Sequence, residues 1–173
     1  METKSNITIL RNLLDEDARK FVGAEILLKK HLQGWVKAAS SLKLKGVLQR
    51  YLDFVQRHSE KLEGFFEEEK INFIRVSDRV MQAFVEEAEE KLANCTDAVV
   101  KDACLLACVQ SINHYKISTY GTAAAFANTM EMENAEYLFH ELEMNEKDID
   151  NSLSLLAEHD INSKAIAPLV LNS

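Results

Sequence analysis

The sequence contains very little proline and glycine. Among 173 residues there are five Gly and one Pro, and Pro168 lies near the C-terminal end. Because both residue types interrupt helices, their scarcity leaves long stretches in which a helix can continue. A chain of 19.6 kDa can also bury a sizeable core without disulfide or metal support. We therefore expect residues 1–173 to form a single domain built from long helices.

The sequence also lacks a long apolar run and an excess of basic residues. No uninterrupted apolar segment has the length of a signal core or a membrane span, so we expect a cytoplasmic protein without a membrane partner. The 20 Lys and Arg residues are interspersed among 28 Asp and Glu residues, and the formal net charge is -8. This balance argues against a nucleic-acid partner.

Cysteine is scarce as well, and its spacing excludes the common cysteine motifs. Cys95, Cys104 and Cys108 are the three cysteines, and none of them forms a Cys-x-x-Cys pair. We expect reduced thiols. Cys104 and Cys108 stand one helical turn apart among Ala and Leu, which is typical of small apolar core residues, and a redox role is the alternative.

Apolar residues recur at spacings of three and four along most of the chain, which indicates amphipathic helices. Four long helices are predicted, over residues 7–39, 42–69, 98–129 and 135–160. The stretch 70–95 is less regular and predicts a shorter helix. Ser40 and Ser41 before the second helix, and the sequence Asn-Cys-Thr-Asp before residue 98, are suitable N-terminal caps.

The connections between these helices indicate how they pack. Few residues link the first helix to the second or the third long helix to the fourth, so each pair should be antiparallel. The shorter helix between the two hairpins then serves as a crossover. This order predicts an all-α, ferritin-like antiparallel four-helix bundle with a shorter additional crossover helix. The tail 162–173 is apolar enough to need a docking surface on the bundle or on a second subunit.

Two segments carry a resemblance to a known family. They are DACLLACVQSINHYKISTYGT at residues 102–122 and EKDIDNSLSLLA at residues 146–157. Both are similar to the YciE/YciF-type ferritin-like family of bacterial stress-associated proteins, and so is VGAEILLKKHL around Glu25. The frame of the family's third-helix motif is kept at six positions: Asp102, His114, Tyr115, Tyr120, Gly121 and Thr122. The resemblance implies a helical, often dimeric protein, and some family members resemble diiron carboxylate proteins.

The resemblance also implies which residues would remain from a two-metal carboxylate site. Glu25 matches the carboxylate of the first helix, and Glu146 and Asp150 match the acidic pair of the fourth. The other two helices depart from the family pattern. Asn113 and Lys116 stand where the third-helix motif has paired Glu residues, and the His and Glu expected on the second helix fall at Tyr51 and Asp53-Phe54.

The presence of Lys116 determines whether a metal site is expected inside the bundle. An ammonium group repels each unit of positive charge at 4 Å by roughly 4 kcal/mol with an effective dielectric constant near 20. We therefore expect an interior ion pair between Lys116 and Glu25, Glu146 or Asp150. The side chains expected to complete its hydrogen bonds are Tyr51, Tyr120 and Asn113. Two alternatives stay open: Lys116 reaches the surface and the acids are solvated, or a metal site survives.

These expectations lead to three functional hypotheses. In the first, the protein is a non-catalytic member of its family that forms a homodimer or binds a partner protein, and it needs no cofactor. In the second, it is a metal-dependent oxidoreductase or iron-handling protein that binds iron or manganese through Glu25, Glu146 and Asp150. In the third, it is a structural stress protein whose apolar tail forms a dimer.

Overall fold

The predicted all-α bundle is confirmed. The structure is a computed structural model that describes residues 6–72 and 76–166, and these residues contain no β-strand. The helices are α1 (Leu10–Ala38), α2 (Leu42–Glu68), α3 (Arg79–Asn94), α4 (Ala98–Thr129), α5 (Glu133–Leu156), the π-helical turn η1 (Ala157–Ile161) and the short α6 (Asn162–Lys164). No helix in the described part of the chain is both long and apolar enough to cross a membrane.

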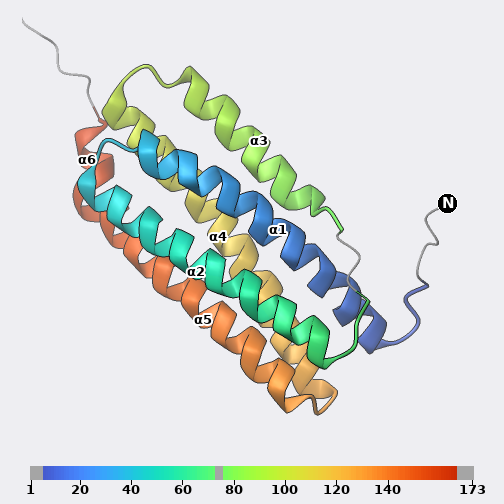
Figure 1. Ribbon diagram of the computed structural model, residues 1–173. Coiled ribbons are helices and arrows are strands. Elements are labelled where there is room, and N and C mark those ends of the chain that lie inside the picture. The colour runs from blue at the N-terminus through green and yellow to red at the C-terminus, as the bar shows by residue number, and fades with distance from the viewer. Residues whose placement is uncertain (1–5, 73–75, 167–173) are drawn as a thin grey trace, which may run out of the picture.

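Four long helices form the bundle, and its chain path is two hairpins joined by a crossover. The four pack as a ring in which α1 contacts α2 and α4, and α5 contacts the same two helices. Figure 1 shows that helices adjacent in this ring run antiparallel, whereas α2 and α4, at opposite corners, run in the same direction. The crossover helix α3 carries the chain back along the bundle after α2, so that α4 can run in the same direction as α2. A single long crossover has the same role in ferritin-like bundles.

The helix ends lie close to the predicted positions because the expected caps form. The Ser41 hydroxyl accepts a hydrogen bond from the Leu44 backbone N–H at 3.3 Å and begins α2. The Asp97 carboxylate accepts hydrogen bonds from the backbone N–H groups of Val99 and Val100 and begins α4. These bonds satisfy donors that an uncapped helix end would leave unpaired. At the other end of the molecule, α5 begins two residues before the predicted start.

The crossover helix α3 lies outside the ring and covers α1 and α4. Asp78 caps it by accepting hydrogen bonds from the backbone N–H groups of Val80 and Met81, both at 2.9 Å. Before α3, the chain passes so close to α1 that a Cβ atom at Gly23 would collide with the carbonyl oxygen of Val76. Gly23 therefore permits the close approach of the crossover segment.

The buried apolar residues form two clusters, one toward each end of the bundle. The first begins at Ala24 on α1, extends to Ala39 directly after this helix, and includes residues of α2, α3, α4, α5 and η1. The second includes Leu14 to Val22 on α1 and residues of α2, α4 and α5. The buried side chains of Glu25, Lys116 and Glu146 each stand between residues of the two clusters along their helices. The predicted docking of the tail 162–173 stays a prediction, because residues 167–173 lie outside the described residues.

Candidate functional site

A group of polar side chains from all four long helices meets inside the bundle. Its members are each 0–2% exposed: Glu25 of α1, Tyr51 and His58 of α2, Asn113, Lys116 and Tyr120 of α4, and Glu146 of α5. We call these seven residues the interior cluster. Six of them are residues that the sequence analysis singled out. Burial of this kind is costly unless the polar groups pair with one another.

Lys116 connects the two acids of the interior cluster. Its ammonium nitrogen lies 2.9 Å from Oε1 and 3.1 Å from Oε2 of Glu25, and it also forms an ion pair with Oε1 of Glu146. The aromatic rings of Tyr51 and Tyr120 flank the ammonium at 5.0 and 5.8 Å. The structure thus places Lys116 inside the bundle, and not at the surface, where a snorkelling side chain would lie.

Each acid also accepts hydrogen bonds from neutral side chains. Tyr120 donates its hydroxyl proton to Oε1 of Glu25. Tyr51 donates to Oε2 of Glu146 at 2.6 Å, and the Asn113 amide donates to the same oxygen at 2.7 Å and to the backbone carbonyl of Glu146 at 2.9 Å. Both carboxylates therefore have an ion pair and a tyrosine partner, which offsets much of the cost of their burial.

The electrostatics of the interior cluster favour its charged form. Burial opposes the charge on Glu25, but the Lys116 ammonium, together with His58 and Tyr120, outweighs this effect and lowers the pKa of Glu25 to about 2. Burial likewise opposes the charge on Lys116, but Glu146 and Glu25 raise its pKa above the ordinary value. Burial and the nearby carboxylates raise the pKa of Tyr51 and Tyr120 well above the ordinary value, so both remain proton donors.

His58 is the member that the sequence analysis missed. Its Nδ1 atom lies 3.6 Å from Oε1 of Glu25 and 3.5 Å from Oε1 of Glu146. Its Nε2 atom lies 3.3 Å from the side-chain nitrogen of Asn145. One donor atom each from Glu25, His58 and Glu146 lies within 4.8 Å of the other two, so these residues have the spacing of metal ligands.

The sequence around His58 keeps only one half of a metal-ligand pair, so it carries no complete motif. Dinuclear carboxylate sites use Glu-x-x-His pairs on two helices. Val55 stands three residues before His58, and Ile149 stands three residues after Glu146. Each helix thus keeps one half of such a pair. The resemblance to the family instead predicts the second-helix ligand positions at Tyr51 and Asp53-Phe54.

Asp150 is the one predicted site residue that the structure does not bring into the interior cluster. Its carboxylate accepts a hydrogen bond from Gln110 at 2.9 Å and lies 2.8 Å from Nε2 of His114. The side chains of His114 and Asp150 are 59% and 26% exposed. Four residues rotate a helix by about 40° beyond a full turn, and this is enough to move Asp150 to the rim while Glu146 stays inside.

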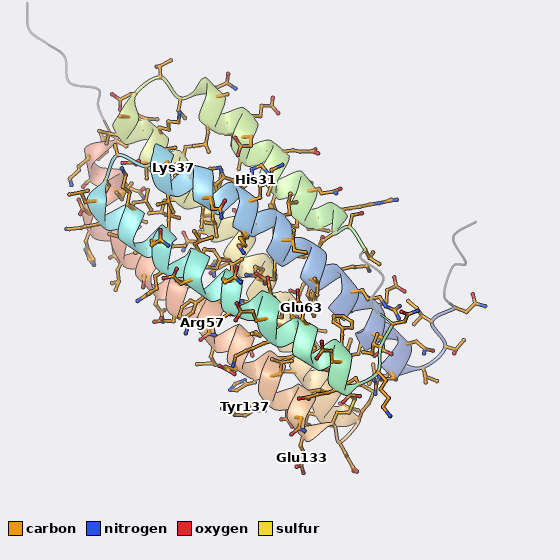
Figure 2. The ribbon with its side chains drawn as sticks, in the orientation of Figure 1. His31, Lys37, Arg57, Glu63, Glu133 and Tyr137 are labelled. Carbon is orange, nitrogen blue, oxygen red and sulfur yellow. The ribbon has the colours of Figure 1, made fainter. Side chains whose placement is uncertain are left out.

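Outside the interior cluster, the helices carry the charged surface usual for a bundle. Figure 2 shows Arg57 and Glu63 pointing away from α2, and Tyr137 and Glu133 pointing away from α5. Arg57 is exposed although its neighbour His58 is fully buried. Helix rotation therefore separates sequence neighbours into two environments.

Comparisons with known proteins agree with this architecture. Residues 9–166 match the family described as a domain of unknown function, DUF892. The protein YciF of Escherichia coli is 31% identical over 143 residues, which cover 82% of this chain and 86% of that protein. The crystal structure of the E. coli stress protein YciF has a TM-score of 0.84 and 27% identity, and the match covers 90% of this chain and 99% of that one.

A second solved structure, YcfI from Rhodopseudomonas palustris, also has a TM-score of 0.84, with 24% identity over 87% of this chain and 96% of that one. At this identity the match concerns the fold alone. The match to the family covers nearly the whole chain, and the identity to YciF covers 82% of it. The chain therefore belongs to the DUF892 family, together with YciF.

Proposed function

We propose that this protein is a non-catalytic member of its family that works through self-association or through binding a partner protein, with Lys116 in the place of bound metal. The observation that carries the proposal is the ion pairing of the Lys116 ammonium with both buried acids, Glu25 and Glu146. YciF of E. coli is described as a stress protein. We extend a stress-associated role to this chain as part of the proposal.

The donor set supports the loss of a two-metal site. Two divalent ions need several anionic oxygens, and among the described residues the interior cluster supplies only the carboxylates of Glu25 and Glu146. The ammonium of Lys116 already neutralises one of these two charges. A divalent ion about 4 Å from this ammonium would be repelled by roughly 8 kcal/mol with an effective dielectric constant of 20. The residues present therefore do not fit a dinuclear cluster.

Metal analysis tests this part of the proposal. The full chain is unfolded, refolded with excess ferrous or manganous ion without oxygen, freed of loose ions by gel filtration and analysed by mass spectrometry for metal. We expect no stoichiometric metal in the wild-type protein. The matched variant Lys116→Ala should bind about one ion per chain through Glu25, His58 and Glu146. Two ions per wild-type chain would overturn the proposal.

Light scattering tests the self-association part. The wild-type chain should elute with a mass near twice 19.6 kDa at micromolar concentration. A chain that ends at Asp160 tests whether the tail is responsible, and a loss of the dimer on truncation would assign the contact to residues 161–173. A wild-type monomer across the whole concentration range would contradict self-association and leave the partner protein as the proposed mode of action.

A metal-dependent oxidoreductase or iron-handling protein is the second candidate. The observation in its favour is the mutual spacing of donor atoms in Glu25, His58 and Glu146 within 4.8 Å. For one ion to bind there, the Lys116 ammonium would have to leave the two carboxylates. Oxygen consumption on adding ferrous ion to the wild-type protein would favour this candidate, and no consumption would favour the first.

A further inference from the structure

The outward side of α5 carries a row of exposed apolar side chains. Tyr137, Met144 and Leu155 are 73%, 47% and 60% exposed, and Figure 2 shows Tyr137 pointing away from the bundle. Because an α-helix has about 3.6 residues per turn, these three positions lie within about 20° of one line along α5. The line is about 27 Å long at about 1.5 Å per residue. Single exposed apolar residues are common, but an aligned row of them is typical of an interaction surface.

The acidic residues beside this apolar row are paired with cations of α2. Glu141 and Asp148 lie within about 40° of the row on the same helix. The Glu141 carboxylate is 2.5 Å from the Lys61 ammonium, and the Asp148 carboxylate is 3.5 Å from the Arg50 guanidinium. The chain has a formal net charge of -8, so two copies repel each other overall. On this side of α5 the acids and cations balance, and the repulsion between two copies is smallest there.

A second copy of the chain fits the row when the two α5 helices run antiparallel. In a two-fold dimer the same surface of each subunit contacts the other. A two-fold axis perpendicular to α5 beside position 146 pairs three positions with those of the partner subunit: Tyr137 with Leu155, Glu141 with Asn151, and Met144 with Asp148. Both acids then face neutral residues. In a parallel pair Glu141 and Asp148 would each face the same acid of the partner subunit, and like charges oppose such a contact.

A groove beside Tyr137 offers space for the apolar side chain of the second copy. It lies between α2 and α5, has a volume of about 480 Å³, and includes Phe65 and Leu138 in its lining. Gly64 also lines it, and a Cβ atom at Gly64 would meet no atom within 4 Å, so the groove is open at this position. The two-fold axis brings the exposed Leu155 of the partner subunit to this end of α5. The surface therefore carries both a protruding apolar residue and a space to receive it.

We propose that the protein forms an antiparallel two-fold dimer through the outward sides of α5, with Leu155 of each subunit beside the groove next to Tyr137 of the other. This inference rests on the proposed self-association and names the surface that produces it. Burial of the apolar row drives the association. The ion pairs with α2 lie at the rim of the contact, where charged groups stay in water.

Light scattering of the full chain across micromolar concentrations tests this surface. Met144→Glu places a carboxylate opposite Asp148 of the partner subunit, so we expect the dissociation constant of the dimer to rise at least about tenfold. Met144→Lys should weaken the dimer less, because its ammonium would face that acid. The matched control is Val80→Glu. Val80 is 47% exposed, as Met144 is, but it belongs to α3, which packs against α1 and α4. This control should leave the dissociation constant unchanged.

Cross-linking tests the antiparallel direction. Cys95, Cys104 and Cys108 are replaced by Ser, and chains with Tyr137→Cys are mixed with chains with Leu155→Cys. After oxidation, mass spectrometry of non-reduced peptides should show links between residues 137 and 155. Links between two 137 positions should be absent, because these positions are about 27 Å apart in the antiparallel dimer, beyond the reach of a disulfide. Far-ultraviolet circular dichroism confirms that each variant is folded.

The outcomes separate this inference from the proposed self-association. A wild-type dimer that persists unchanged in Met144→Glu, or that gives links between two 137 positions, overturns the antiparallel α5 contact and leaves self-association standing. A dimer that is lost when the chain ends at Asp160 assigns the contact to the tail and overturns the α5 contact as well. A wild-type monomer across the whole concentration range overturns both.

Discussion

The α4–α5 pair carries two groups of ionisable side chains about one helical turn apart, one inside the bundle and one at its surface. Inside, Lys116 forms ion pairs with Glu146 of α5 and Glu25 of α1, and all three are at most 2% exposed. At the surface, Asp150 pairs with His114, whose side chain is 59% exposed. Both groups contain basic and acidic side chains, but the inner group is shielded from water and the outer group is exposed to it.

This difference shows how burial changes the contribution of a charged group to the stability of the folded protein. When an exposed ion pair forms, each charged group loses contacts with water and gains a partner. The net stabilisation is small, typically about 0–1 kcal/mol. A buried group has no water to return to, so removal of its partner leaves an uncompensated charge and costs about 3–5 kcal/mol. The inner group should therefore dominate the stability of the bundle, and the outer group should be nearly neutral. Substitutions and pH can test this contrast.

The largest effect is expected from Lys116→Met, which keeps the length of the side chain and removes its charge. Glu25 and Glu146 would then face each other without a cation in the interior. We expect the free energy of unfolding in urea to fall by about 3–5 kcal/mol at pH 7. A loss below about 1 kcal/mol would mean that the interior charges are solvated or protonated, and that the inner pair resembles the outer one.

The second-largest effect is expected from acid, which should reduce the stability that the inner group contributes. The ordinary pKa of Glu is 4.5 and that of Glu25 in the folded protein is about 2, so the unfolded chain takes up the proton first. The stability that Glu25 contributes is present above pH 4.5 and is lost as the pH falls from 4.5 to 2.

A matched variant isolates the contribution of Glu25 to this loss. Asp160 responds in the same window, because hydrogen bonds from Lys164 and Lys43 also lower its pKa to about 2. The stability of the wild-type protein and of Glu25→Gln should therefore be compared at each pH. The difference between them should shrink below pH 4.5. A difference that stays constant down to pH 2 would contradict the low pKa of Glu25.

Tyr51→Phe should have a smaller effect of the same kind. It removes the 2.6 Å hydrogen bond to Glu146 but leaves the Lys116 ion pair and the Asn113 hydrogen bond in place. A buried hydrogen bond to a charged group contributes about 1.5–3 kcal/mol, so the free energy of unfolding should fall by that amount. Equilibrium unfolding in urea measures it. No change at all would show that a water molecule replaces the hydroxyl without cost.

Asp150→Ala should have the smallest effect. It removes the surface partner of His114 and the acceptor of Gln110, both of which can turn to water. We expect less than about 1 kcal/mol in the unfolding free energy, and a smaller difference still in 1 M salt. A loss as large as that of Lys116→Met would show that this residue belongs with the inner group after all.

The sequence predicted much of the fold and part of the site. The caps at Ser41 and Asp97, and the scarcity of helix breakers, were sufficient to place the long helices within a few residues of their observed ends. The sequence predicts an ion pair of Lys116 with Glu25, Glu146 or Asp150, and the structure places the Lys116 ammonium beside Glu25 and Glu146. Single-domain organisation, metal loss and dimerisation stay predictions.

His58 and Asp150 show where sequence reasoning stopped. His58 is fully buried between two aromatic rings, with Phe54 stacked at 6.3 Å and Tyr120 edge-on at 5.8 Å. Its neighbour Arg57 is exposed. The periodic pattern defines the face of a helix that points into the core, but a residue at the edge of that face can lie either in the core or at the surface. A pattern of single residues therefore could not distinguish the buried His58 from the other four histidines.

By itself, the sequence determined the helices, their order and the presence of a cation among acidic residues, because caps, periodicity and side-chain charge are local properties. Only the tertiary structure decided which acids meet Lys116 and that His58 joins them. Helix rotation and packing set these contacts, and both depend on how all the helices fit together at once.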